Sequence, residues 1–90
     1  MPVGSLTSII DAVVNVYRIA YGIEPEDINC GLCEEFADDV CRFVAGSRKM
    51  FIDELSGGTL PSHAVIVYGG IYYDAECPTG SADWHNLIRR

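Results

Sequence analysis

The chain has 90 residues, of which 49% are hydrophobic and 21% are charged, a composition that indicates one small globular domain over residues 1–90. Its formal net charge of −7 excludes the clustered Lys and Arg that nucleic acid or anionic lipid requires. No apolar run approaches the ~20 residues of a membrane span. Residues 1–20 lack the basic and apolar regions of a signal peptide, so we expect a cytoplasmic protein with reduced thiols.

The first half of the chain has two amphipathic patterns. Apolar residues recur at helical spacing over residues 5–20, which predicts a helix with a broad apolar face. Residues 23–31 are rich in Pro, Asp, Asn and Gly, and we expect a loop there. A second helix is predicted over residues 32–45, with an apolar stripe on one side and acidic residues on the other.

The second half of the chain predicts a small antiparallel sheet. Strands are expected over residues 49–55, 63–68 and 71–77. Gly69 and Gly70 form a two-residue hairpin turn between the last two strands. Residues 78–80 end the last strand, and a short helix over residues 82–88 turns Trp84 and Leu87 inward. Two helices, a small antiparallel sheet and a short C-terminal helix make an α+β domain.

The predicted hairpin brings two titratable residues together. A two-residue turn pairs Tyr68 with Ile71, and the same register sets Val65 opposite Asp74. His63 has the same pleat parity as Val65, so it lies diagonally across from Asp74 on one face of the sheet. Diagonal neighbours are within reach of long side chains. The hairpin therefore predicts a contact between His63 and Asp74.

Cys33 completes a catalytic constellation. It lies at the predicted start of the second helix, where unpaired N–H groups and the helix dipole stabilise a thiolate and can form an oxyanion hole. A nearby His63 would stabilise the thiolate further, and Asp74 would fix the tautomer and the orientation of the imidazole. The candidate catalytic residues are therefore Cys33, His63 and Asp74.

These residues also carry a resemblance to a family. The segment Gly31–Ala37 (GLCEEFA) resembles the Gly-x-Cys-x-(acidic)-aromatic-Ala signature of transglutaminase-like cysteine enzymes. The segment His63–Ala75 (HAVIVYGGIYYDA) resembles their His strand, turn and Asp strand. The order Cys, His, Asp also matches the wider papain-like fold. The resemblance covers roughly residues 29–78. Within that superfamily, the short motif set of this chain is similar to that of small phage and bacterial proteins.

The resemblance implies a minimal papain-like (transglutaminase-like) domain with a Cys-His-Asp triad. In that reading Cys33 is the nucleophile, His63 is the general base and acid, and Asp74 orients the imidazole. The reaction is acyl transfer on a protein or peptide, as in a peptidase, an amidase or a transglutaminase, and it needs no cofactor.

Three further residues are weaker candidates around the same site. Asn29 is the candidate amide donor for the oxyanion hole. Tyr72 shares the pleat parity of Asp74 and is the candidate aromatic residue of a substrate groove. Cys30 is a rival nucleophile, because its surroundings resemble a motif of cell-wall amidases in the same broad fold.

Two other readings use different residues. An inactive acidic protein on the same fold, phage-encoded and acting on a host protein, would dock a basic partner through the acidic helix face. The residues of that face are Glu34, Glu35, Asp38 and Asp39. So small a core also predicts a homodimer that covers the sheet.

A structural zinc site is the remaining alternative. It would combine Cys30, Cys33 and Cys77 with His63 or His85. A strong zinc signature needs a second close pair of ligands, which the sequence lacks, so no metal site is predicted.

Overall fold

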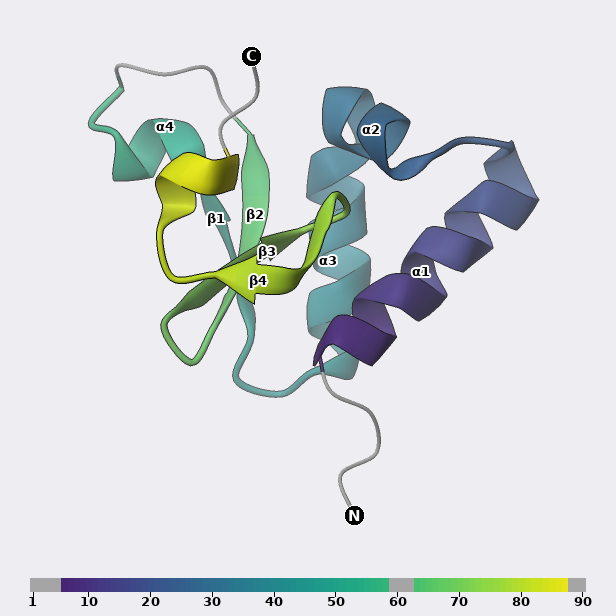
Figure 1. Ribbon diagram of the computed structural model, residues 1–90, viewed down its shortest axis with the longest axis horizontal. Helices are drawn as coiled ribbons and strands as arrows, with labels where there is room; N and C mark the ends of the chain where they lie inside the picture. Colours follow the sequence, from purple (N-terminus) through teal and green to yellow (C-terminus); the bar gives the residue numbers. More distant parts are fainter. Residues whose placement is uncertain (1–5, 59–62, 88–90) are drawn as a thin grey trace.

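The computed structural model describes residues 6–58 and 63–87 and has an α+β fold, as the sequence predicts. The elements are α1 (Leu6–Tyr21), α2 (Pro25–Asp27), the π-helical segment η1 (Ile28–Leu32), α3 (Cys33–Phe43), β1 (Arg48–Phe51), α4 (Ile52–Leu55), β2 (Ala64–Tyr68), β3 (Ile71–Asp74), β4 (Cys77–Ser81) and the 3₁₀ helix η2 (Trp84–Leu87). The strands form one antiparallel sheet in the order β1-β2-β3-β4. Figure 1 shows α1 and α3 on one side of the sheet, with α4 and η2 on the other.

Side chains alternate between two buried clusters along β2. Ala64 and Ile66 belong to the larger cluster, which α1 and α3 cover. Val65 belongs to the smaller cluster on the opposite face, together with Ile52 and Leu87. Successive residues of a strand point to opposite faces, so a strand covered on both sides reads as a continuous apolar run. The sheet is therefore buried on both faces around β2.

The segment before α3 is helical, and the prediction of a loop over residues 23–31 is wrong for most of its length. Pro25 occupies the first position of α2, where its missing N–H costs nothing. The backbone N–H of Glu24 donates to Asp27 Oδ2 at 3.0 Å, one half of a capping box. The helical path then continues through the π-helical residues 28–32 into α3. The loop was predicted because these residue types favour turns. Here Glu24 and Asp27 instead cap the start of a helix at Pro25.

The predicted strand over residues 49–55 is also wrong in its second half. β1 ends at Phe51, and residues 52–55 form the short helix α4. The backbone N–H of Ile52 still donates to the carbonyl of His63 at 2.9 Å, so the chain leaves the sheet directly beside the start of β2. Ile52 is buried in the smaller cluster, and burial of this side chain favours the turn over a longer strand.

An unpredicted edge strand, β4, occupies residues 77–81, where Pro78 and Gly80 indicated a break. Pro is tolerated on an edge strand because its missing donor faces away from the sheet. Gly80 has a φ of +82°, and a Cβ built there would lie 2.5 Å from Ile71 and 2.6 Å from Tyr73. The hydroxyl of Thr7 donates to the Pro78 carbonyl at 2.7 Å and ties β4 to α1. Both residues that indicated a break therefore fit an edge strand.

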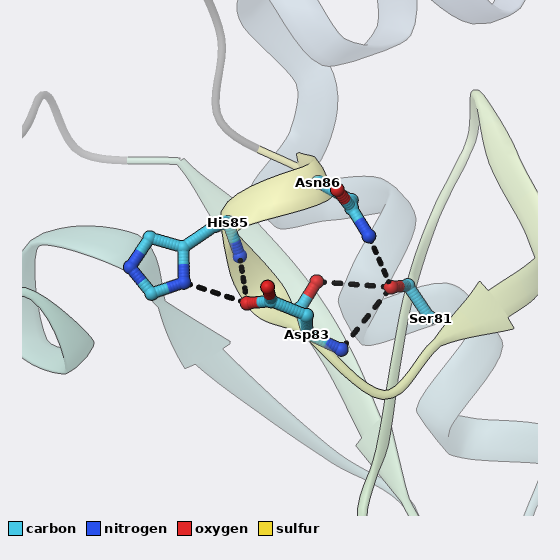
Figure 2. A network of polar contacts seen from close by, with 4 residues as sticks. All are labelled: Ser81, Asp83, His85 and Asn86. Atoms are coloured by element: carbon cyan, nitrogen blue, oxygen red, sulfur yellow. Dashed lines mark hydrogen bonds and ion pairs between the residues drawn. The ribbon is translucent and has the colours of Figure 1, made fainter.

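The C-terminal helix is shorter than predicted, and residue 88 lies outside the described residues. The structure has the 3₁₀ helix Trp84–Leu87, whose Trp84 and Leu87 pack into the smaller cluster as expected. Figure 2 shows the polar network that holds its start. Ser81 Oγ accepts from the Asp83 N–H at 3.1 Å and from Asn86 Nδ2 at 2.8 Å. Asp83 Oδ1 accepts from the ring Nδ1 of His85 at 2.6 Å.

Across residues 6–58 and 63–87, no single helix combines the length and apolar composition that a membrane crossing needs. Among the described helices, α1 taken together with the helical segment Pro25–Phe43 reaches that length and composition, and the pair is bent by 89°.

Candidate functional site

The predicted contact between His63 and Asp74 is present. The hairpin has the predicted register, with Tyr68 opposite Ile71 and Val67 opposite Tyr72. His63 Nε2 lies 3.0 Å from Asp74 Oδ2, and the two residues are only 3% and 4% exposed. Burying an imidazole and a carboxylate costs desolvation free energy. Such a pair is therefore expected to have either a structural or a functional role.

The contact of Nε2 with Asp74 relates the imidazole tautomer to the charge of the carboxylate. When Asp74 is ionised it only accepts, and Nε2 is then the nitrogen that carries the proton and donates. The other carboxylate oxygen of Asp74 accepts from the backbone N–H of Glu76 at 2.9 Å, which closes the β3–β4 turn. The opposite ring nitrogen, His63 Nδ1, is buried and has no hydrogen-bond partner among residues 6–58 and 63–87. A neutral His63 therefore presents an unused lone pair on Nδ1.

Cys33 lies at the first position of α3, half-buried against the larger core cluster that also contains Ala64, the neighbour of His63. In Figure 1, α3 and β2 both begin at the upper end of the molecule. No hydrogen bond joins the Cys33 thiol to the imidazole of His63, whose Nδ1 is unpartnered. The structure thus forms the His-Asp half of the proposed triad and leaves the thiol out of hydrogen-bonding contact.

The junction before Cys33 differs from the predicted loop. Because η1 runs directly into α3, the first turn of α3 continues a helical path. π-helical segments are rare and occur frequently at functional sites.

Asn29 connects this segment to the turn that carries Asp74. Its Nδ2 donates to Glu76 Oε1 at 2.9 Å, while its buried Oδ1 has no hydrogen-bond partner in the part of the chain that the structure describes. Asn29 and Glu76 are 47 residues apart in the chain, so the contact fixes the β3–β4 turn against η1. The structure engages one N–H of the Asn29 amide in this contact, and its oxyanion role stays a prediction.

Three of the four carboxylates of the acidic helix face have partners within the chain. Lys49 Nζ lies 3.0 Å from Glu34 and 2.9 Å from Asp38, and hydrogen bonds to Asp38 and Glu34 raise the pKa of Lys49. Asp39 accepts from the hydroxyl of Tyr17 at 2.6 Å, which ties α3 to α1. Glu35 is exposed. The positive charge of Lys49 offsets the carboxylate nearest to Cys33 in sequence.

Tyr72 and Cys77 lie on the face of the sheet that carries the smaller cluster. Both pack against the smaller cluster, so the structure uses Tyr72 as a core residue of that face. Cys77 pairs across the turn with Asp74, and burial together with the Asp74 charge raises the pKa of its thiol. Such a thiol is a poor nucleophile at neutral pH.

Sequence reasoning missed Glu76, whose N–H and carboxylate both support the site. The signal was the spacing Asp-x-Glu before Cys77, which is compatible with an Asp-capped two-residue turn.

The remaining thiols do not converge. Cys30 is exposed on η1 and Cys41 is half-buried on α3, and the four cysteines, all within the described ranges, form no disulfide. No group of three or more His, Cys, Asp or Glu side chains is arranged to hold a metal ion in the part of the chain that the structure describes. The ligands of the zinc alternative therefore do not come together.

Comparison of the chain with protein-family models, with curated proteins and with solved structures gave no match.

Proposed function

We propose that the protein is a cysteine-dependent acyl-transfer enzyme on a minimal papain-like, transglutaminase-like fold. Cys33 is the nucleophile, His63 the general base and acid, and Asp74 the residue that orients the imidazole. The observation that supports this proposal is the buried His63–Asp74 contact of 3.0 Å together with the unpartnered Nδ1 of His63. Buried polar atoms without hydrogen-bond partners are rare in proteins. A catalytic base needs a free lone pair to accept a proton, which is one functional explanation for such an atom.

The chemistry follows from the tautomer. With the proton on Nε2 held by Asp74, Nδ1 takes the proton of the Cys33 thiol and leaves a thiolate. The sulfur attacks the carbonyl carbon of an amide or ester, and the carbonyl electrons move onto the oxygen. When the C–N or C–O bond breaks, the leaving group takes the proton back from Nδ1, and a thioester remains on Cys33. Water or an amine then attacks the thioester and restores the thiol.

The charges of Glu34 and Lys49 affect how readily Cys33 forms a thiolate. A carboxylate next to Cys33 in the chain opposes a negative sulfur, and the contact of Glu34 with Lys49 at 3.0 Å reduces that opposition. The proposed substrate is a protein or peptide, and the proposed setting is the reducing cytoplasm, where Cys33 stays a thiol.

The direct test is acylation of the protein by p-nitrophenyl acetate. The thiolate displaces p-nitrophenolate and forms an acetyl thioester, which intact-protein mass spectrometry and peptide mapping locate on one cysteine. We expect the adduct on Cys33, with loss in Cys33→Ala and retention in the matched variant Cys41→Ala, whose thiol is half-buried on the same helix. We expect His63→Ala to slow p-nitrophenolate release by roughly 100-fold or more, the size of a lost general base.

Acetylation mainly on Cys30, or equal release rates in the protein and in His63→Ala, would overturn the proposal. Circular dichroism of each variant separates loss of chemistry from loss of the fold.

A further inference from the structure

A groove of about 620 Å³ lies between α1 and the β3–β4 turn. One wall is formed by α1, through Asp11, Val14 and Arg18. The facing wall is formed by Ala75 and Glu76 of the turn. Val14 and Ala75 are buried, so the deeper surface between the walls is apolar. A volume in this range suits a peptide side chain and its neighbouring backbone.

The charges on the groove are negative overall. Asp11 and Glu76 bring a carboxylate from each wall. The guanidinium of Arg18 is held by the carboxylate of Glu24, with Arg18 Nη2 at 2.9 Å and Nε at 3.1 Å from Glu24 Oε1. That ion pair neutralises the basic residue of the groove, whereas Asp11 has no cation in contact among the described ion pairs. Among residues 6–58 and 63–87, a bound positive charge would therefore meet the carboxylate of Asp11 and the carboxylate of Glu76, which also accepts from Asn29.

One wall of the groove is the turn that follows Asp74 in the chain, beginning with Ala75. The N–H of Glu76 donates to Asp74 Oδ1, and Asn29 donates to the side chain of the same Glu76. The wall that would contact a ligand is thus the turn that positions the carboxylate behind His63.

We infer that this groove binds the positively charged side chain of a peptide, a lysine or an arginine. As a statement about substrate it rests on the proposed function: the enzyme would prefer acyl substrates with a basic residue beside the reacting carbonyl. As a statement about binding it stands on the groove and its two carboxylates alone. An apolar interior accommodates the methylene stem of such a side chain, while the carboxylates at the walls meet its charged end.

The experiment uses the full chain labelled with ¹⁵N and a short probe peptide, acetyl-Ala-Lys-Ala-amide. Its control is the same peptide with an acetylated lysine, which has the same backbone and no charge. We expect the lysine peptide to shift the amide signals of Val14, Asn15, Ala75 and Glu76, and the acetylated peptide to bind roughly two- to fivefold more weakly or worse. We expect Asp11→Asn to weaken binding by a similar factor, and added salt to weaken it as well.

Glu54→Gln is the matched variant, because it removes an exposed carboxylate on α4, outside the groove. Equal binding of the two peptides, signals that shift elsewhere, or equal losses in Asp11→Asn and Glu54→Gln would overturn the inference. The readout needs no turnover. If the groove binds the lysine peptide but Cys33 is inert, the proposed enzymatic function is refuted and the binding site stands. If Cys33 is reactive but the groove does not bind the peptide, the binding site is refuted and the proposed function stands.

Discussion

The two replacements Asp74→Ala and Asp74→Asn separate the structural and the orienting roles of this carboxylate. Asp74 accepts two hydrogen bonds, from His63 Nε2 at 3.0 Å and from the Glu76 N–H at 2.9 Å. Alanine removes both acceptors, so the buried Nε2–H of His63 loses its partner and the N–H of the exposed residue Glu76 loses its bond to Asp74. At about 1–3 kcal/mol for the buried unsatisfied donor and about 0.5–1.5 kcal/mol for the second hydrogen bond, the free energy of unfolding falls by roughly 1.5–4.5 kcal/mol. That is a large share of the stability of a small domain.

Asparagine preserves the shape and changes the chemistry. Its Oδ1 still accepts from the Glu76 N–H, and its Nδ2 donates to His63 Nε2, which must then carry a lone pair. The imidazole proton moves to Nδ1, the nitrogen assigned to the Cys33 thiol. We expect a smaller loss of stability than in Asp74→Ala, about 1–2 kcal/mol, together with a change of tautomer.

Urea unfolding followed by circular dichroism gives the stability differences, and ¹⁵N NMR of the imidazole gives the tautomer. The reasoning fails if Asp74→Ala unfolds with the stability of the unmodified protein. It fails equally if the proton of His63 in the unmodified protein already sits on Nδ1.

Three further results are expected from single sites. Gly80→Ala should lower the free energy of unfolding by about 1–3 kcal/mol, because an L residue at a φ of +82° is strained and its Cβ meets side chains of β3; an unchanged urea midpoint would count against the β4 geometry. Burial and the hydrogen bond to Asp39 raise the pKa of Tyr17 above its ordinary value of 10.0. The stabilisation from this protonated phenol is complete below pH 10 and is lost as the pH rises toward the folded-state pKa, so unfolding curves between pH 9 and pH 11.5 should show a loss that Tyr17→Phe lacks. The hydrogen bonds from His85 lower the pKa of Asp83, so an NMR titration of His85→Ala should find it nearer its ordinary value of 3.8; an unchanged titration midpoint would contradict the network in Figure 2.

The hairpin shows what local sequence determines. Two glycines with positive φ fix a two-residue turn, and once the turn is fixed the register follows from counting. The contact between His63 and Asp74 could therefore be predicted from residues 63–74 without knowledge of the rest of the fold. The apolar periodicity of residues 5–20 was equally sufficient for α1.

The errors arise where tertiary contacts decide the local structure. Pro78 and Gly80 are breakers in isolation, yet β4 forms because β3 supplies partners and Thr7 of α1 anchors the edge. α4 replaces the end of a predicted strand because Ile52 is buried against the far face of the sheet. Neither contact leaves a periodic signal in the sequence.

The sequence predicted the part of the candidate site that lies within one hairpin and missed the contacts that depend on tertiary packing. Asp74 and His63 belong to one hairpin, whereas the link from Asn29 to Glu76 joins segments 47 residues apart. The relation of Cys33 to the hairpin depends on how α3 packs across the sheet, which no local pattern specifies.

The central claim is that the imidazole of His63 activates the thiol of Cys33. Iodoacetamide alkylation at pH 7, followed at each cysteine by mass spectrometry, measures this most directly in the unmodified protein and in His63→Ala. An ordinary thiol is only a few per cent thiolate at this pH. We predict that Cys33 reacts roughly tenfold or more faster than Cys41 and that the advantage disappears in His63→Ala. A Cys33 that reacts no faster than Cys41, or that keeps its rate without His63, would contradict the account.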